Sequence, residues 1–122
     1  MANFNFIMLY VADAQRSADF YENILGRKPV QYSQGYSMFV LDHGIKLGLW
    51  QRGTIDPAAE APAGSGELGF EEASDAAVDE RFAEWTGQGT VVAQKPTRMD
   101  FGYTFVGLDP DGNRLRVYKL GQ

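Results

Sequence analysis

Hydrophobic positions along the first half of the chain predict one helix and four strands. Residues 4–11 are apolar at odd and even positions alike, which is typical of a strand that is covered on both faces. Asp13 then offers a helix cap, and apolar residues recur with helical spacing until Gly26 ends the helix. The expected buried stripe of this helix comprises Ala14, Ser17, Ala18, Tyr21, Ile24 and Leu25. Further strands are expected at 28–33, 36–41 and 45–51, the first of them at a sheet edge because it contains Pro29.

The second half repeats this order after a stretch at residues 52–65 that is rich in Ala, Pro and Gly and has no period. A strand is expected at 66–72, a helix at 74–86 and a strand at 90–95. Ser74 would cap the helix, Gly87 would end it, and Val78, Phe82 and Trp85 would form its buried stripe. A loop carrying Arg98, Met99 and Asp100 then leads into a hairpin at 102–118.

Two stretches about half the chain apart indicate an internal duplication. The stretch from Gly35, GYSMFVLDHGIKLGLW, and the stretch from Gly102, GYTFVGLDPDGNRLRVY, both begin Gly-Tyr-Ser/Thr and reach Leu-Asp before a turn that contains Gly. The fold expected is therefore α+β, a single domain of two βαβββ modules at 1–51 and 66–118, joined by the linker 52–65. Each module would bury one sheet face against the other module or against a partner chain.

Composition and charge narrow the function classes. A chain of 122 residues with 44% hydrophobic residues suits one globular domain, and it contains no cysteine, so disulfides, thiolate nucleophiles and Cys-based zinc sites are not possible. A formal charge of −5 disfavours nucleic acid and anionic membrane surfaces as partners. With no apolar run long enough for a membrane span and no basic, apolar leader, the expected location is the cytoplasm.

Two motifs carry a resemblance to a known family. The stretch VADAQRSADFYENILG near the N-terminus and LDPDGNRLRVY near the C-terminus resemble the vicinal oxygen chelate superfamily, which includes glyoxalase I, extradiol dioxygenases and bleomycin resistance proteins. Residues 16–21, Trp50 and residues 100–105 are most similar to the phenazine-antibiotic resistance proteins of that group. The resemblance implies two curled mixed sheets around a cleft, and commonly a two-fold homodimer, in some cases with exchanged modules.

The resemblance also implies where a metal ion would bind in the family's enzymes. The four corresponding positions here are Phe6, Gly48, Glu67 and Arg116. A phenyl ring and a glycine offer no ligand atom, and a guanidinium is a permanent cation that repels a metal ion. We therefore expect no metal and no other cofactor. A relay through the single histidine, His43, is not expected either, since this residue falls in a turn with no spaced nucleophile and acid.

Strand alternation suggests what the vacated face could bind. Aromatic residues and methionines fall on the face expected to be shared with the four positions, whereas the apolar set Ile7, Leu9, Val11, Leu68, Phe70, Leu115 and Val117 falls on the face covered by helices. The aromatic set is either an ordinary core or the wall of a site for a flat aromatic guest, and glycines at 48, 69 and 107 favour a cavity. The predicted ligand-binding residues are Phe6, Met8, Tyr36, Met38, Trp50, Glu67, Asp100, Tyr103, Phe105, Arg116 and Tyr118.

Three functions remain open at this point. The first is a metal-free, non-catalytic homodimer that sequesters a planar, aromatic, antibiotic-like molecule. The second is an enzyme, either a divergent metal-dependent lyase or a metal-free isomerase that uses Glu67 as base. The third is a protein that binds other proteins through exposed edge strands. Arg116 has two expected roles, either contacting an acidic or ring substituent of the ligand or forming an ion pair with Glu67.

Overall fold

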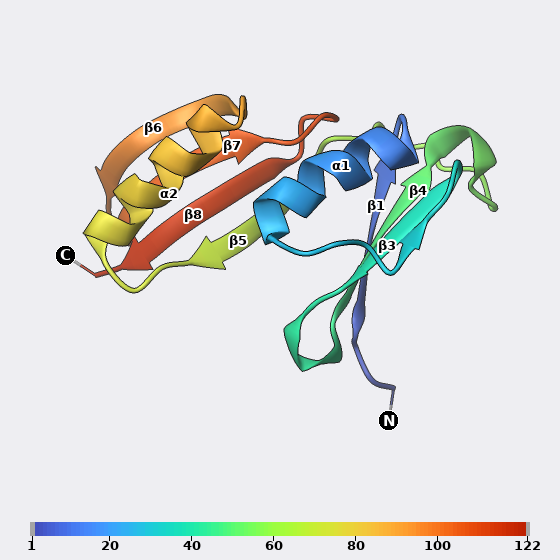
Figure 1. The fold of residues 1–122 in the computed structure, drawn as a ribbon, viewed down its shortest axis with the longest axis horizontal. Helices are drawn as coiled ribbons and strands as arrows, with labels where there is room; N and C mark the ends of the chain where they lie inside the picture. Colours follow the sequence, from blue (N-terminus) through green and yellow to red (C-terminus); the bar gives the residue numbers. More distant parts are fainter. Residues whose placement is uncertain (1, 122) are drawn as a thin grey trace. The chain divides into compact units, whose positions relative to one another are not determined.

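The chain forms two four-stranded mixed sheets, each accompanied by one long helix, in a computed structural model that describes residues 2–121. Contacts divide the chain into two compact units, Met1–Gly64 and Ser65–Gln122, called unit 1 and unit 2 below. Both sheets are open and keep two edge strands each (Figure 1). The expected α+β class and the β-α-β-β-β order in each half are confirmed.

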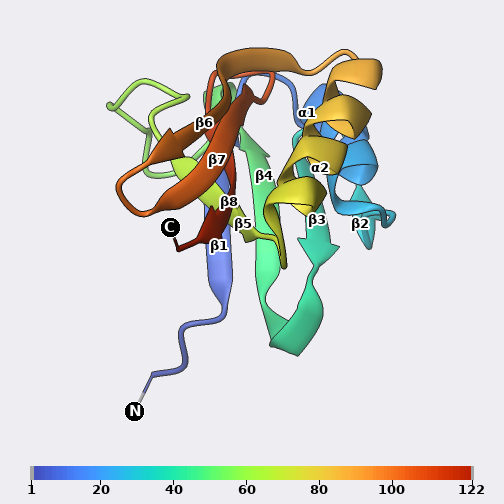
Figure 2. The same ribbon diagram turned by 90° about the vertical axis from the view of Figure 1, so that its left-hand side faces the viewer.

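Unit 1 has the strand order β1-β4-β3-β2, in which β1 and β4 are parallel and the other neighbours are antiparallel. Figure 2 shows the long β3–β4 hairpin and the turn that closes it. The elements are β1 (Phe6–Val11), α1 (Ala14–Leu25), β2 (Gln31–Tyr32), β3 (Tyr36–Val40), the 3-10 turn η1 (Asp42–Gly44), β4 (Lys46–Gln51) and the 3-10 turn η2 (Arg52–Thr54).

Helix α1 begins and ends where its capping residues are. The Asp13 carboxylate accepts hydrogen bonds from the backbone N–H groups of Gln15 and Arg16, both at 3.1 Å, and Gly26 adopts the left-handed conformation with φ of 67°. Five of the six residues of the expected stripe are buried, and Leu25 is half-buried. The sheet side chains that are buried in unit 1 are Val11, Ser37, Phe39, Leu47 and Leu49. These alternate with the residues of the opposite face, so α1 covers one face of the sheet.

Unit 2 repeats the plan with the strand order β5-β8-β7-β6, in which β5 and β8 are parallel. Ser74 caps its helix through the backbone N–H of Ala77 at 3.0 Å, and Trp85 is buried against the rings of Phe70 and Phe105 in edge-to-face geometry. Figure 1 shows the helix lying across one face of this sheet. The elements are β5 (Glu67–Glu71), α2 (Asp75–Gly87), β6 (Val91–Met99), β7 (Gly102–Leu108) and β8 (Arg114–Leu120).

Two expected boundaries were wrong. Strand β6 continues to Met99, so Arg98 and Met99 lie in a strand rather than in a loop. Pro96, which has no N–H to donate, is accommodated because β6 is an edge strand whose register shifts between Val92 and Gln94 and again between Gln94 and Thr97. Strand β2 covers only two of the six residues expected at 28–33, although the backbone N–H of Val30 still donates to the carbonyl of Met38 at 2.8 Å.

The first part of the linker has more structure than its composition predicts. Arg52 donates hydrogen bonds to the carbonyl oxygens of Ala61 at 2.7 Å and Ala59 at 3.3 Å, and Ile55 is buried. A guanidinium with several donors can therefore organise a stretch that has no hydrophobic period. None of the helices within residues 2–121 is long and apolar enough to cross a membrane.

The turn between β7 and β8 fixes the start of β5. Buried Asp109 accepts hydrogen bonds from the backbone N–H of Asn113 at 2.8 Å and from its Nδ2 at 2.9 Å. Asn113 Oδ1 in turn accepts from the backbone N–H of Gly66 at 3.0 Å. The Asp-Pro-Asp-Gly-Asn sequence therefore has a structural role, since it aligns the parallel pair β5 and β8.

Candidate functional site

The face of the unit 1 sheet opposite α1 carries aromatic rings, thioethers and one charged side chain. Strand register places its residues in three rows that cross β1, β4 and β3. We call this surface the aromatic face. Its rows are Tyr10–Trp50–Tyr36, Met8–Gly48–Met38 and Phe6–Lys46–Val40.

Three side chains bend over Gly48 in the middle row. A Cβ atom at this position would lie 2.7 Å from Met8 Sδ, 2.9 Å from Phe6 Cε1 and 2.9 Å from Tyr36 Oη. Glycine therefore lets the neighbouring side chains occupy the centre of the face, which corrects the expectation that Gly48 leaves an empty space. Burial raises the pKa of the Tyr36 phenol, so its hydroxyl stays protonated to a higher pH than that of an ordinary tyrosine.

A hollow of about 330 Å³ lies beside these side chains and is lined by Met8, Tyr36 and Trp50. Its lining is a thioether, a phenol and an indole, which suit dispersion and ring-stacking contacts with an apolar guest. Phe6 and Tyr10 of the same face are 37% and 40% exposed, so they are accessible although they are large and hydrophobic. The aromatic face thus offers an apolar surface next to a cavity of small-molecule size.

Five of the predicted site residues come together on this face, namely Phe6, Met8, Tyr36, Met38 and Trp50. Tyr10 and Lys46 also lie there, and they were not among the predicted binding residues. The strand alternation that predicted Trp50 and Met8 also places Lys46 and Tyr10 on this face. Lys46 precedes Trp50 by four residues and Tyr10 follows Met8 by two, and even spacings along a strand lie on the same face.

In unit 2, Arg116 lies on the sheet face opposite α2 and is held by several acceptors. Its Nε donates to Glu67 Oε2 at 3.1 Å, and its Nη1 lies 3.3 Å from both Gln94 Oε1 and Thr104 Oγ1. The guanidinium carbon lies 5.8 Å from the centre of the Phe101 ring. The expected ion pair between Arg116 and Glu67 is confirmed. Gln94, Thr104 and Phe101 were missed, because strands β6 and β7 and the turn between them bring these residues to Arg116 from other parts of the sequence.

Two predicted residues lie on the other face of this sheet. Tyr103 donates from its hydroxyl to Asp79 Oδ1 of α2 at 2.7 Å, and Phe105 packs edge-to-face against Phe82 and Trp85 of the same helix. Their expected position on the same face as Arg116 was wrong. The register pairs Val106 with Arg116, so the even-numbered residues of β7 share the face of Arg116 and the odd-numbered ones face α2.

The remaining predicted residues take different positions. Tyr118 lies on the face of Arg116, where its Cε1 would be 3.3 Å from a Cβ at Gly69. Gly107 faces α2 instead, since a Cβ there would lie 3.4 Å from Trp85 Cε3. Asp100 is exposed in the turn between β6 and β7, and Glu67 is engaged by Arg116.

The four positions that correspond to metal ligands do not provide a suitable donor set. Phe6 and Gly48 of unit 1 supply no ligand atom, and in unit 2 the Arg116 guanidinium occupies the Glu67 carboxylate. Within residues 2–121, no group of three or more His, Asp or Glu side chains is arranged to hold a metal ion. The chemistry of these side chains therefore does not fit a divalent cation.

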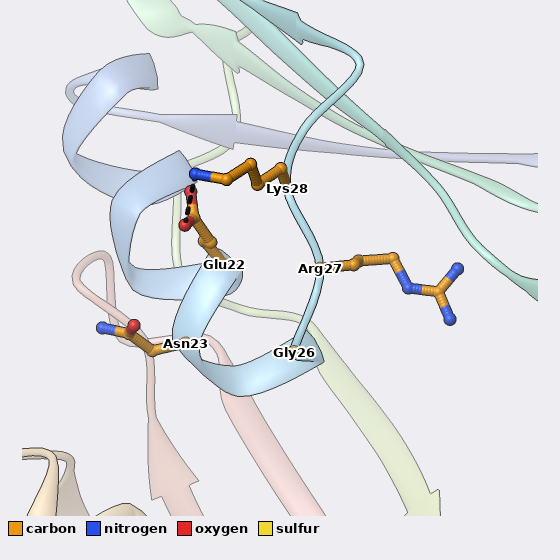
Figure 3. Close-up of a pocket in the computed structure, with 5 residues that line it drawn as sticks. All are labelled: Glu22, Asn23, Gly26, Arg27 and Lys28. Carbon is orange, nitrogen blue, oxygen red and sulfur yellow. Dashed lines mark ion pairs between the residues drawn. The ribbon is translucent and has the colours of Figure 1, made fainter.

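A second hollow, of about 340 Å³, lies at the C-terminal end of α1 and differs in character. Figure 3 shows Lys28 directed toward Glu22, with which it forms an ion pair at 3.6 Å, and Arg27 directed away. Arg27 donates instead to the carbonyl of Val40 and to Asp42. This charged lining is unsuitable for an apolar aromatic molecule, so the aromatic face is the better candidate.

The chain is similar to known proteins both in sequence and in fold. Phenazine antibiotic resistance protein EhpR of Enterobacter agglomerans is 35% identical over 119 residues, which cover 95% of this chain and 91% of that protein. The solution structure of protein ATC0852 from Agrobacterium tumefaciens is 47% identical, covers 100% of both chains and has a TM-score of 0.88. A glyoxalase-related enzyme from Fulvimarina pelagi shares the fold at 19% identity, with a TM-score of 0.82 over 98% of this chain and 88% of that one.

The sequence model of the glyoxalase, bleomycin resistance protein and dioxygenase superfamily matches residues 3–117. This match covers nearly the whole chain and agrees with the resemblance expected from the two sequence motifs. The chain therefore belongs to the glyoxalase/bleomycin resistance protein/dioxygenase superfamily.

Proposed function

We propose that this protein binds a flat aromatic, antibiotic-like small molecule and gives resistance by holding it rather than by converting it. The observation that carries the proposal is the apolar hollow on the aromatic face, lined by Met8, Tyr36 and Trp50. Ring stacking on such side chains contributes about 1 kcal/mol per pair beyond the burial of apolar area. The relative named for phenazine antibiotic resistance supports the same ligand class.

The proposal of binding without chemistry rests on the side chains that replace a metal-binding set. Phe6 and Gly48 cannot ligate, and Glu67 is paired with Arg116, so neither a metal-bound substrate nor a free carboxylate base is favoured. Protection then follows from mass action. It requires a protein concentration above both the dissociation constant and the concentration of the drug.

Tryptophan fluorescence tests the proposal, because the two tryptophans lie in different surroundings. Trp50 lines the hollow, whereas Trp85 belongs to α2 and is buried between that helix and the sheet of unit 2. We expect phenazine to quench the emission of the wild type and of Trp85→Phe, and to quench Trp50→Phe little. Calorimetry should show that Trp50→Ala binds about tenfold or more weakly.

Recovery of the ligand distinguishes binding from catalysis. After incubation with a stoichiometric amount of protein, with and without added Mg²⁺, Zn²⁺ or Ni²⁺, mass spectrometry should recover the phenazine unchanged. A metal-dependent product would contradict the proposal and support a lyase or an isomerase. Failure of phenazines and other flat aromatic compounds to bind would remove the ligand class and favour a protein partner.

We further propose that the functional form is a two-fold homodimer, with or without exchanged modules, as the resemblance implies. A closed two-fold assembly would present two equivalent sites. Sedimentation equilibrium should give twice the mass of the 13.5 kDa chain. A monomer at micromolar concentration that still binds ligand with full affinity would contradict the dimer and leave the binding function standing.

A further inference from the structure

Lys46 is the charged side chain of the otherwise apolar aromatic face. It pairs with Phe6 on β1 and with Val40 on β3, so it occupies the centre of the third row. Side chains at positions 46, 48 and 50 of a strand leave the same face, and Trp50 and Gly48 fix which face that is. The ammonium group therefore belongs to the surface that contains the hollow, at the end away from Trp50.

No carboxylate of the described part of the chain forms an ion pair with Lys46. The acidic residue of its own hairpin, Asp42, is engaged by Arg27 at 3.2 Å. Arg116 differs, because the charge of its guanidinium is compensated by Glu67 at 3.1 Å. Lys46 is thus a cation without a compensating charge, and its neighbours Phe6 and Val40 are both apolar.

The spacing along β4 relates this charge to the ring surface. Successive rows are about 7 Å apart along a strand, so the Cα atoms of Lys46 and Trp50 are separated by about 13 Å. A fused ring system that contacts Trp50 and covers the middle row would direct its far edge toward Lys46. A negative group at that edge would be attracted to the ammonium, and because Phe6 and Val40 are 37% and 38% exposed, solvent and salt screen part of this attraction.

We propose that Lys46 recognises a carboxylate substituent on the flat aromatic ligand, so that the preferred guest is an aromatic acid rather than a neutral ring system. This inference rests on the proposed function, since it assigns the chemical class of the ligand at the same surface. Lys46 acts here as a specificity determinant, whereas the rings and thioethers of the face supply the apolar contacts. A lysine suits this role because its ammonium reaches out on an apolar stem.

The test compares two compounds of nearly the same shape, phenazine-1-carboxylate and phenazine-1-carboxamide, by calorimetry at pH 7.5. We expect the wild type to bind the carboxylate more tightly, with a preference that shrinks as salt is added. Lys46→Met retains the stem but removes the charge. It should weaken carboxylate binding about three- to tenfold and leave carboxamide binding unchanged, whereas Lys46→Arg should retain most of the preference.

Lys28→Met is the matched control, since it removes one positive charge at the end of α1, where Lys28 pairs with Glu22. It should bind both compounds like the wild type. Equal affinity of the wild type for the two compounds, or equal weakening of both by Lys46→Met, would overturn the role of Lys46 alone. If Lys28→Met lost as much affinity for the carboxylate as Lys46→Met, the role of Lys46 would also be overturned, in favour of a general effect of net charge. If neither compound binds, the proposed function itself fails.

Discussion

Arg116 and Glu67 lie on neighbouring parallel strands of unit 2, with the guanidinium Nε 3.1 Å from the carboxylate Oε2. The side chain of Arg116 is 20% exposed and that of Glu67 is 42% exposed, so solvent screens part of their attraction. Gln94 and Thr104 accept from the same guanidinium. The position that we expected to correspond to a metal ligand thus carries a guanidinium, and Glu67 neutralises its charge.

A double-mutant cycle measures this ion pair. We expect Arg116→Met and Glu67→Gln each to lower the free energy of unfolding by about 1 kcal/mol, with a coupling energy of about 0.5 kcal/mol because Glu67 is well exposed. Urea denaturation of the wild type, the two single variants and the double variant gives these free energies. Purely additive effects would show that the two side chains do not interact in solution.

Phe105 should matter for stability and not for ligand contact. It is 1% exposed and packs on Phe82 and Trp85, so Phe105→Ala should cost about 3–5 kcal/mol in unfolding free energy. Phe105→Leu should remain folded and bind phenazine with the affinity of the wild type. A folded Phe105→Leu with strongly reduced affinity would show that this ring does reach the ligand.

Two glycines should respond differently to alanine. At Gly48 a methyl group meets the mobile ends of Met8, Phe6 and Tyr36, which can move aside, so Gly48→Ala should cost about 1 kcal/mol and displace those ends. At Gly102, with φ of 151°, a Cβ would lie 2.0 Å from the backbone oxygen of Lys119, which cannot move without breaking the strand pair. Thermal melts should show a slightly lower melting temperature for Gly48→Ala and no folded state for Gly102→Ala. Phenazine affinity should fall in Gly48→Ala, and an unchanged value would place the ligand elsewhere.

Tyr103 should titrate at a pH above that of an ordinary tyrosine. Its hydrogen bond to Asp79 is the main cause of the raised pKa, and burial adds to it. The folded state therefore holds this proton more tightly than the unfolded state, whose tyrosine pKa is about 10. The resulting stabilisation is fully present below pH 10 and is lost as the pH rises through the folded-state pKa.

Asp79→Asn removes the negative charge and should move the pKa of Tyr103 back toward its ordinary value. Absorbance at 295 nm follows the phenolate, and subtraction of the Tyr103→Phe titration isolates this residue from the other tyrosines. Glu80→Gln, on the same helix, is the charge control and should leave the titration unchanged. An identical titration of Asp79→Asn and the wild type would argue against the hydrogen bond.

Asn113 should contribute strongly to the stability of the β7–β8 turn. Replacement by alanine leaves the N–H of Gly66 and one oxygen of Asp109 without their side-chain partner, and Asn113 is 3% exposed. The expected cost is about 2–3 kcal/mol in unfolding free energy. Arg114→Ala, at an exposed position of the same hairpin, should change the stability little. Equal effects of the two substitutions would contradict this account of the turn.

Short-range signals predicted most of the fold. Asp13, Gly26 and Ser74 fix helix ends through contacts within a few residues, so the sequence places them well. Alternation also assigned Trp50, Met8 and Met38 to one face, because β1, β3 and β4 pair without a register shift. Regular strands preserve the relation between sequence position and face.

The errors come from features that depend on contacts between distant residues. The faces of Tyr103 and Phe105 follow from the pairing of β7 with β8, and an aromatic residue alone does not show whether it faces a helix or a cavity. The length of β6 depends on bulges that accommodate Pro96 at a sheet edge. Arg52 organises the linker through carbonyl groups, which every residue has and no sequence pattern marks.

Gly48 and Gly69 each lack a side chain, but they lie on different strands of the parallel pairs in the two units. In unit 1 the glycine is on β4 and is covered by Met8 and Phe6 of β1, whereas in unit 2 the glycine is on β5 and is covered by Tyr118 of β8. In both units a side chain of the parallel partner strand thus reaches over the glycine, and in unit 1 Tyr36 of β3 does so as well. The double exchange Gly48→Met with Met8→Gly should consequently be milder than Gly48→Met by itself.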